Sequence, residues 1–151
     1  MDLRSVLGVL RDPESGQLLD KPQPTYADLP DLVEDARASG MQVEYDDFVG
    51  ASGPSMPEVT GRTVYRIVQE GLTNARKHAP GALVTVRLSG SEGDGVDVLV
   101  RNPLGFRSSD APPSGLGLVG LRERAELRGG RLDAGPDGST WVLHGWIPWE
   151  S

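Results

Sequence analysis

Apolar side chains recur at helical spacing over Val64–Ala79 of this 151-residue chain. They stand three and four positions apart, at Val64, Ile67, Val68, Leu72 and Ala75. Such a stripe predicts an amphipathic helix with one buried face. Pro80 and Gly81 follow directly and are expected to end the helix. We therefore expect the rest of the fold to be organised around this helix.

The remaining pattern predicts shorter helices and a set of strands. One helix is expected over Asp28–Gly40, with Asp28 as its N-cap, and another over Leu116–Arg128, closed by two glycines. Residues 3–10 are apolar with helical period, as at the end of a longer helix or in a short terminal one. Apolar alternation predicts strands at Met41–Phe48, Ala82–Leu88, Val96–Val100, Arg131–Ala134 and Thr140–Ile147. Hairpins between neighbouring strands imply an α+β fold: a two-layer sandwich of a mixed, largely antiparallel sheet with helices on one face.

The central helix carries a polar group that suits a magnesium-bound phosphate. Glu70 and Asn74 stand one helical turn apart, so their side chains can reach the same small volume, and Lys77 follows on the last turn. Magnesium prefers oxygen ligands and shares them between one or two side chains, water and phosphate. The alternative is an ordinary solvated surface on which Glu70 pairs with Arg66 or Arg76. Asn74 favours the site, because asparagine has poor helix propensity in mid-helix.

A second stretch, SGLGLVGLRER at Ser114–Arg124, predicts an anion site. Gly115 and Gly117 leave backbone amides uncovered where a helix begins, with the positive end of the helix dipole behind them. The G-x-G-x-x-G spacing does not indicate a dinucleotide fold, because a Pro-rich polar loop precedes it instead of a strand. Gly120 is expected to permit close helix packing, and the arginines after it to lie on the surface.

Together the two stretches resemble the ATP-binding domain of sensor histidine kinases. VYRIVQEGLTNARKHA resembles the N box of that family, and GLGLVGLRERAELRGG its second glycine box. The L-R-E-R-x-x-x-L-x-G-G ending resembles the subfamily whose response regulators carry a helix-turn-helix output domain. The resemblance covers residues 7–148 and implies a Bergerat-type ATP-binding fold, with ATP and Mg²⁺ as ligands.

The resemblance implies a role for each polar position. Asn74 would be the magnesium ligand and Glu70 the acid that positions water or assists proton removal from the incoming histidine. Lys77 would contact phosphate, and the amides of Gly115 and Gly117 the β- and γ-phosphates. One departure stands at the first glycine box, where Asn102 occupies the place of the family's adenine-reading aspartate and Leu104 that of a glycine. Of the two histidines, His78 is expected to pack at or cap the helix end, and His144 to be a packed sheet residue.

Composition narrows the class of protein further. The formal net charge of −7 argues against general nucleic-acid binding. The absence of cysteine excludes a disulfide framework and a thiolate metal site. No apolar run reaches membrane-spanning length and no signal peptide is recognisable, so a cytoplasmic chain without membrane contact is expected, although a full-length kinase can be anchored elsewhere.

The resemblance also divides the chain into segments with different partners. Residues 1–11 would be the end of a truncated dimerisation helix, 12–27 a linker, and 28–151 the catalytic domain. The acceptor histidine would lie in the dimerisation domain of the full-length kinase, and the phosphoryl group would pass on to a response regulator. The isolated chain is therefore expected to be a monomer that does not phosphorylate itself.

Two alternatives from other classes stay open. The altered first glycine box is compatible with a degenerate module that binds nucleotide weakly and acts through protein contacts, although the intact N box opposes this. A related ATPase or an anti-sigma-type serine kinase is the other alternative, and the L-R-E-R ending argues against it.

Overall fold

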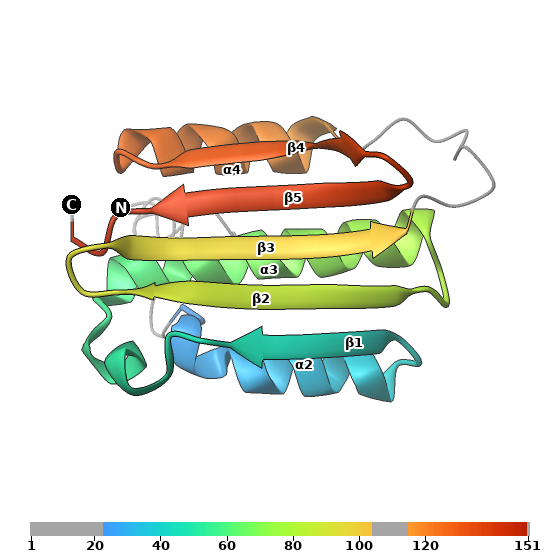
Figure 1. The fold of residues 1–151 in the computed structure, drawn as a ribbon, viewed down its shortest axis with the longest axis horizontal. Helices are drawn as coiled ribbons and strands as arrows, with labels where there is room; N and C mark the ends of the chain where they lie inside the picture. The colour runs from blue at the N-terminus through green and yellow to red at the C-terminus, as the bar shows by residue number, and fades with distance from the viewer. Residues whose placement is uncertain (1–22, 104–114, 151) are drawn as a thin grey trace, which may run out of the picture.

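The computed structural model describes residues 23–103 and 115–150 (Figure 1). Three α-helices are present in these ranges: α2 (Leu29–Ala38), α3 (Glu58–His78) and α4 (Gly115–Leu127). Two short 3₁₀ helices, η1 (Tyr26–Asp28) and η2 (Gly50–Ser55), precede α2 and α3. The strands are β1 (Gln42–Asp47), β2 (Leu83–Ser91), β3 (Gly95–Pro103), β4 (Arg131–Asp137) and β5 (Thr140–Ile147).

The strands form a single mixed sheet in the order β1-β2-β3-β5-β4. β1 pairs with β2 in parallel, and the other neighbouring pairs are antiparallel. The β2–β3 and β4–β5 hairpins confirm the two predicted ones, although the paired strands run further toward the turns than the alternation indicated. In the first of these turns Gly93 and Gly95 have positive φ angles, which an L side chain rarely adopts. The predicted α+β class and the mixed, mostly antiparallel sheet are confirmed.

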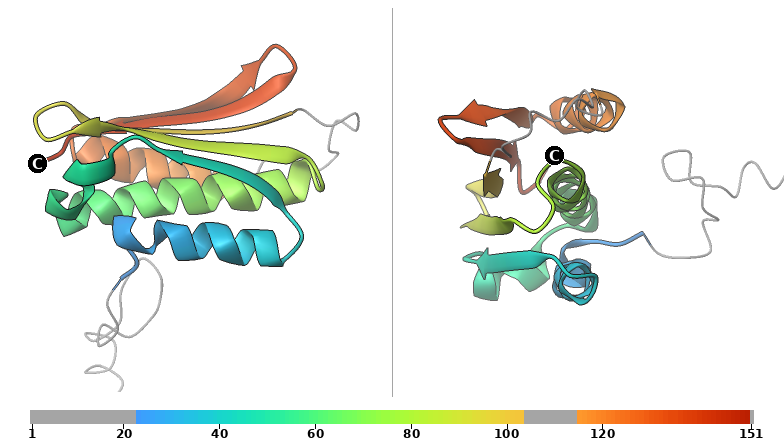
Figure 2. Two further views of the ribbon diagram at one scale, coloured as in Figure 1. Left: turned by 60° about the horizontal axis from the view of Figure 1, so that its bottom comes forward. Right: turned by 90° about the vertical axis from the view of Figure 1, so that its right-hand side faces the viewer.

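All three α-helices cover one face of this sheet, and the other face is open (Figure 2). Alternation along the strands explains the difference, because side chains at every second position face the helices. The buried set from β2 and β3 is Val84, Val86, Leu88, Val96, Val98 and Val100. His144 belongs to the open face, where its Nε2 lies 2.9 Å from Oδ1 of Asp97. The expectation that His144 is packed in the sheet is therefore wrong: its side chain is half exposed.

The central helix α3 begins at Glu58, earlier than the apolar stripe predicted. In these additional turns of α3, the buried side chains are small and polar instead of apolar. Thr60 is fully buried, and its hydroxyl donates to the carbonyl of Trp149 at 2.7 Å. A hydroxyl satisfied in this way can be buried without a large penalty, so hydropathy alone does not reveal the segment as part of the core-facing helix.

The helix α2 begins where it was predicted, with Asp28 at its N-cap position, but the predicted role of the Asp28 side chain differs. Asp28 makes no side-chain capping bond to α2. Its carboxylate instead accepts a hydrogen bond from the backbone N–H of Thr25 at 2.9 Å, which fixes η1. Tyr26 packs against the core and donates its hydroxyl to the carboxylate of Asp47. Burial, and then this carboxylate, raises the pKa of Tyr26 above its ordinary value. The predicted helix over residues 3–10 lies outside the described residues.

None of the helices in the described ranges combines the length and the apolar character needed to cross a membrane.

Candidate functional site

Three elements meet at one edge of the domain, at the right in Figure 1. β3 ends there at Pro103 and α4 begins there at Gly115, while α3 contacts both elements. The C-terminal half of α3, which holds the polar group predicted from the sequence, points toward the same edge. The fold therefore brings both predicted motifs to one edge, although β2, β3 and the chain that follows β3 separate them in sequence.

A glycine in α3 sets how closely this helix approaches the sheet. A Cβ atom added at Gly71 would lie 2.7 Å from Cγ1 of Val100 in β3, well inside contact distance. Only glycine therefore allows the observed approach at this point. Gly71 was not singled out from the sequence, although a glycine in the interior of a long helix, which destabilises it by about 1 kcal/mol, is a signal for close packing.

The buried carboxamide of Asn74 is the most informative group at this edge. Asn74 is 6% exposed, one helical turn after Glu70. Its Oδ1 atom is buried and has no hydrogen-bond partner. Leaving such an acceptor unsatisfied costs about 1–3 kcal/mol, so buried polar atoms without partners call for an explanation. A cation or a donor that arrives with a ligand would satisfy this oxygen.

The two charged neighbours of Asn74 remain accessible. Glu70 is half buried and Lys77 is exposed on the last turn of α3. Glu70 forms no ion pair with Arg66 or Arg76, so the surface-pair alternative has no support in the described structure. His78 is half buried on the same final turn, where it was expected to pack.

Asn102 stands near the end of β3 and faces the helix layer. It is 5% exposed, while its neighbours Arg101 and Pro103 are exposed on the other face. Its Nδ2 donates to the carbonyl of Pro103 at 3.0 Å. This local bond occupies one donor of the amide that stands at the predicted base-reading position.

The second motif lies at the start of α4, as predicted, with Gly115 and Gly117 in the first turn. The first backbone amides of this 13-residue helix have no partner within the helix, and the positive end of its dipole lies at the same N-terminus. Gly120, in contrast, borders open space: an added Cβ would meet nothing within 4 Å. The expectation that Gly120 permits close helix packing is therefore wrong. Arg122 is exposed as expected, and its Nε donates to the carbonyl of Leu132 at 3.0 Å.

The donor set at this edge fits magnesium better than a softer metal. In the two described ranges no three histidine, cysteine or acidic side chains gather closely enough to hold an ion. A single carboxamide oxygen at Asn74, completed by water and phosphate oxygens, is the arrangement that Mg²⁺ accepts.

Three curated proteins illustrate the sequence similarity. The chain is 42% identical over 71 residues to the oxygen sensor histidine kinase NreB of Staphylococcus carnosus. It is 34% identical over 94 residues to the signal transduction histidine-protein kinase/phosphatase DegS of Brevibacillus brevis, and 36% identical over 94 residues to the sensor histidine kinase YxjM of Bacillus subtilis. These matches cover 46%, 60% and 62% of this chain. They cover 20%, 24% and 22% of the relatives. No protein-family model matches the chain.

Solved structures show the same fold. The blue-light activated histidine kinase of Erythrobacter litoralis superposes with a TM-score of 0.65 at 21% identity, over 83% of this chain and 42% of that one. The catalytic domain of histidine kinase ThkA superposes with a TM-score of 0.51 at 17% identity, over 79% of this chain and 86% of that one. This chain is a relative of the sensor histidine kinases.

The histidine-kinase relationship confirms the family and the fold expected from the two motifs. Since this chain spans about a fifth to a quarter of the curated kinases, it corresponds to only one part of them. The residues that the sequence predicted, Glu70, Asn74, Lys77 and Asn102, come from two elements that Gly71 holds in contact.

Proposed function

We propose that this domain binds magnesium-ATP at the edge formed by α3, β3 and α4. We further propose that it supplies the γ-phosphate to a histidine in a separate dimerisation domain. The observation that carries the proposal is the buried Oδ1 of Asn74, which has no hydrogen-bond partner and lies one turn from Glu70. An oxygen held in this state suits a ligand that arrives with a hard cation.

The reaction breaks the bond between the γ-phosphorus and the β–γ bridging oxygen of ATP, and forms a bond from that phosphorus to an imidazole nitrogen. ADP leaves with the electron pair of the broken bond. The imidazole must lose the proton on its attacking nitrogen, and Glu70 would accept it, directly or through water. Most of the acceleration in phosphoryl transfer comes from positioning and from charge neutralisation.

The remaining site residues would hold the nucleotide. The Asn74 oxygen would bind Mg²⁺, which supplies neutralisation of the phosphate charge when bound. Lys77, exposed on the last turn of α3, would contact phosphate oxygens. The amides of Gly115 and Gly117 at the start of α4 would donate to the β- and γ-phosphates. Asn102 would meet the adenine edge, with one acceptor oxygen in place of an aspartate's charge.

The partners follow from the same relationship. The acceptor histidine would belong to the dimerisation domain of the full-length kinase, and a response regulator with a helix-turn-helix output would receive the phosphoryl group from it. We propose residues 1–11 as the end of the dimerisation helix, 12–27 as the linker and 28–151 as the catalytic domain. Within the proposed linker, Thr25 bonds to the carbonyl of Glu58 and Tyr26 to the carboxylate of Asp47.

One observation favours a second candidate, a degenerate module with weak nucleotide binding. Asn102 replaces the base-reading carboxylate, and its amide is already engaged with the carbonyl of Pro103. Such a module would act through protein contacts and not through phosphoryl transfer.

Titration calorimetry separates these candidates. Magnesium-ATP should bind with one site per chain, and chelation of magnesium should weaken the binding. Absence of binding at millimolar nucleotide would support the degenerate module against the kinase. A parallel assay of released phosphate tests the ATPase alternative, because a kinase domain without its acceptor should release little phosphate over many minutes, whereas sustained multiple turnovers would contradict the proposal.

A further inference from the structure

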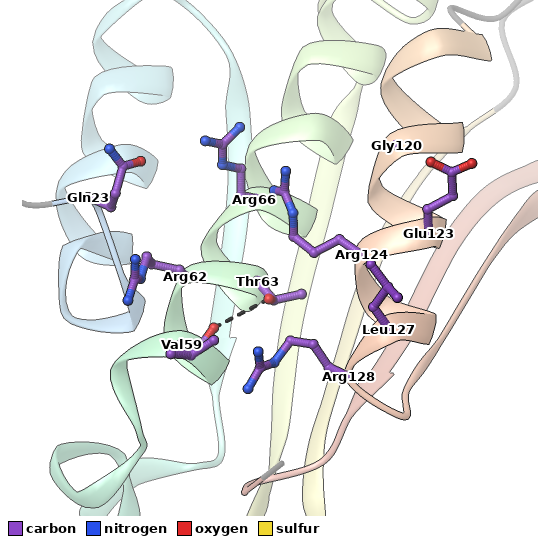
Figure 3. Close-up of a pocket in the computed structure, with 10 residues that line it drawn as sticks. All are labelled: Gln23, Val59, Arg62, Thr63, Arg66, Gly120, Glu123, Arg124, Leu127 and Arg128. Carbon is purple, nitrogen blue, oxygen red and sulfur yellow. Dashed lines mark hydrogen bonds between the residues drawn. The ribbon is translucent and has the colours of Figure 1, made fainter. Parts of the chain in front are cut away.

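Away from the nucleotide edge, a basic pocket opens between the N-terminal half of α3 and the C-terminal half of α4. Its cavity measures about 520 Å³. Arginines on each helix stand one turn apart and line it, Arg62 and Arg66 on α3 and Arg124 and Arg128 on α4. Glu123 is the acidic residue at its wall, and it points away from the arginines in Figure 3. Arg66, Arg124 and Arg128 lie within the two motif stretches, but none of them has a role in the proposed nucleotide site.

The cluster is unusual for this chain, and two of its four arginines have no partner in the described structure. Four guanidinium groups gather around one cavity, although the chain carries a net charge of −7. The side chains of Arg62 and Arg66 make no hydrogen bond or ion pair with any described residue. Gln23, at the edge of the same pocket, has a buried Nε2 without a hydrogen-bond partner. An acceptor that enters the pocket would satisfy this donor and pair with Arg62 and Arg66.

The shape of the pocket favours a peptide segment over a small anion. Arg62 and Arg66 lie about 6 Å apart along the helix axis, so the positive charge extends over a full turn on each helix. Two apolar side chains line the same end, Val59 at 41% and Leu127 at 88% exposure. A phosphate ion would leave this apolar surface in water, whereas an acidic segment that also carries leucines would cover it.

We propose that this arginine pocket binds the chain's own residues 12–20, the acidic part of the linker before α2. That segment reads DPESGQLLD, with three carboxylates, two leucines and no basic side chain. Gln23 lies in the pocket wall, so the chain enters the described fold beside the site. Asp20 is three residues from Gln23, so at about 3.3 Å per residue it can lie up to about 10 Å from Gln23, and the nine-residue segment is long enough to follow the turn of about 6 Å between the arginines.

The contact would give the linker a defined position on the catalytic domain. A segment held against α3 and α4 fixes the path of the chain that precedes the described residues. Because the pocket lies on the half of α3 opposite to Asn74, the contact is separate from the nucleotide, and it does not depend on the proposed function.

Hydrogen exchange in the full chain tests the proposal, measured at low salt over peptides from residues 12–20. Removing two arginines with R62Q/R66Q should accelerate exchange there about fivefold, the ratio that about 1 kcal/mol corresponds to. The intrinsic exchange rates stay the same, because the substitutions lie outside the segment. The matched control is R101Q/R131Q, which removes two exposed arginines from the open sheet face and should leave exchange unchanged.

A charge swap makes the test specific. In a chain with E14R/D20R, exchange over residues 12–20 should be slower when R62E/R66E is also present than when the wild-type arginines remain. The proposal would be overturned if exchange over residues 12–20 is the same in wild type and R62Q/R66Q, and the same in E14R/D20R with and without R62E/R66E. Two further results would overturn it in favour of another occupant. A dimer that R62Q/R66Q dissociates, without any change over residues 12–20, would indicate a second copy of the chain. Binding of pyrophosphate that R62Q/R66Q abolishes, again without that change, would indicate a small anion.

Discussion

The contact between Gly71 and Val100 gives the sharpest test of how the fold positions the site. In Gly71→Ala the new Cβ would lie 2.7 Å from Cγ1, 2.8 Å from Cβ and 2.9 Å from Cγ2 of Val100. Val100 is buried on a central strand, so α3 and β3 must move apart by about 0.7 Å to restore a distance of 3.4 Å.

Two effects of opposite sign then decide the stability of this variant. Alanine favours the helical backbone by about 1 kcal/mol over glycine. Overpacking in a well-packed core destabilises by about 1–3 kcal/mol. We therefore expect a net change in the free energy of unfolding between about zero and 2 kcal/mol destabilising. The shift of α3 should also move Asn74, one turn away, and weaken magnesium-ATP binding several-fold.

Gly120→Ala is the matched control, because the same chemical change there meets open space. It should stabilise the domain by up to about 1 kcal/mol and leave nucleotide affinity unchanged. Urea unfolding gives the stabilities and calorimetry the affinities. In the double variant Gly71→Ala/Val100→Gly all three clashing atoms of Val100 are gone, so nucleotide affinity should recover even though stability falls. If Gly71→Ala is as stabilising as Gly120→Ala and binds nucleotide like wild type, the close approach does not position the site.

Three further predictions concern single positions. Asn102→Asp should tighten ATP several-fold and raise its preference over GTP, because a charged acceptor strengthens the bond to the adenine amino group and repels a guanine carbonyl; an unchanged ATP/GTP ratio in calorimetry would place base reading elsewhere. Gly117→Val should weaken triphosphate binding by blocking amides at the start of α4, with an unchanged far-ultraviolet dichroism spectrum; full affinity would exclude the phosphate loop there. Tyr26→Phe should destabilise the domain by about 1.5–3 kcal/mol in urea unfolding, because its hydroxyl bonds to the Asp47 carboxylate; a change below 0.5 kcal/mol would show that this bond does not hold η1.

The spacing of apolar residues predicted the helices and strands well wherever the side chains that face the core are apolar. The stripe from Val64 to Ala75 and the alternation in β2 and β3 both come from side chains that face the core. The start of α3 was placed too late, because Thr60 is buried through a hydroxyl hydrogen bond that a hydropathy pattern does not contain.

The site was predictable in its residues but not in its assembly. One helical turn between Glu70 and Asn74 follows from the spacing alone. Their position beside the end of β3 depends on the approach of Gly71 to Val100, which joins segments far apart in the sequence. The basic pocket could not be predicted for the same reason, since its arginines come from two helices that only the fold brings together.

The affinity for ATP with and without magnesium, in wild type and in Asn74→Ala, tests the central claim most directly. At a concentration about 100 times its dissociation constant, magnesium-ATP should stabilise the wild-type domain by about 2.7 kcal/mol. Chelating magnesium should remove most of that gain. Asn74→Ala should show one weak affinity whether magnesium is present or not, while Asn74→Asp, which keeps an oxygen ligand, should retain the dependence. An Asn74→Ala variant that responds to magnesium as wild type does would contradict the assignment of this oxygen to the metal.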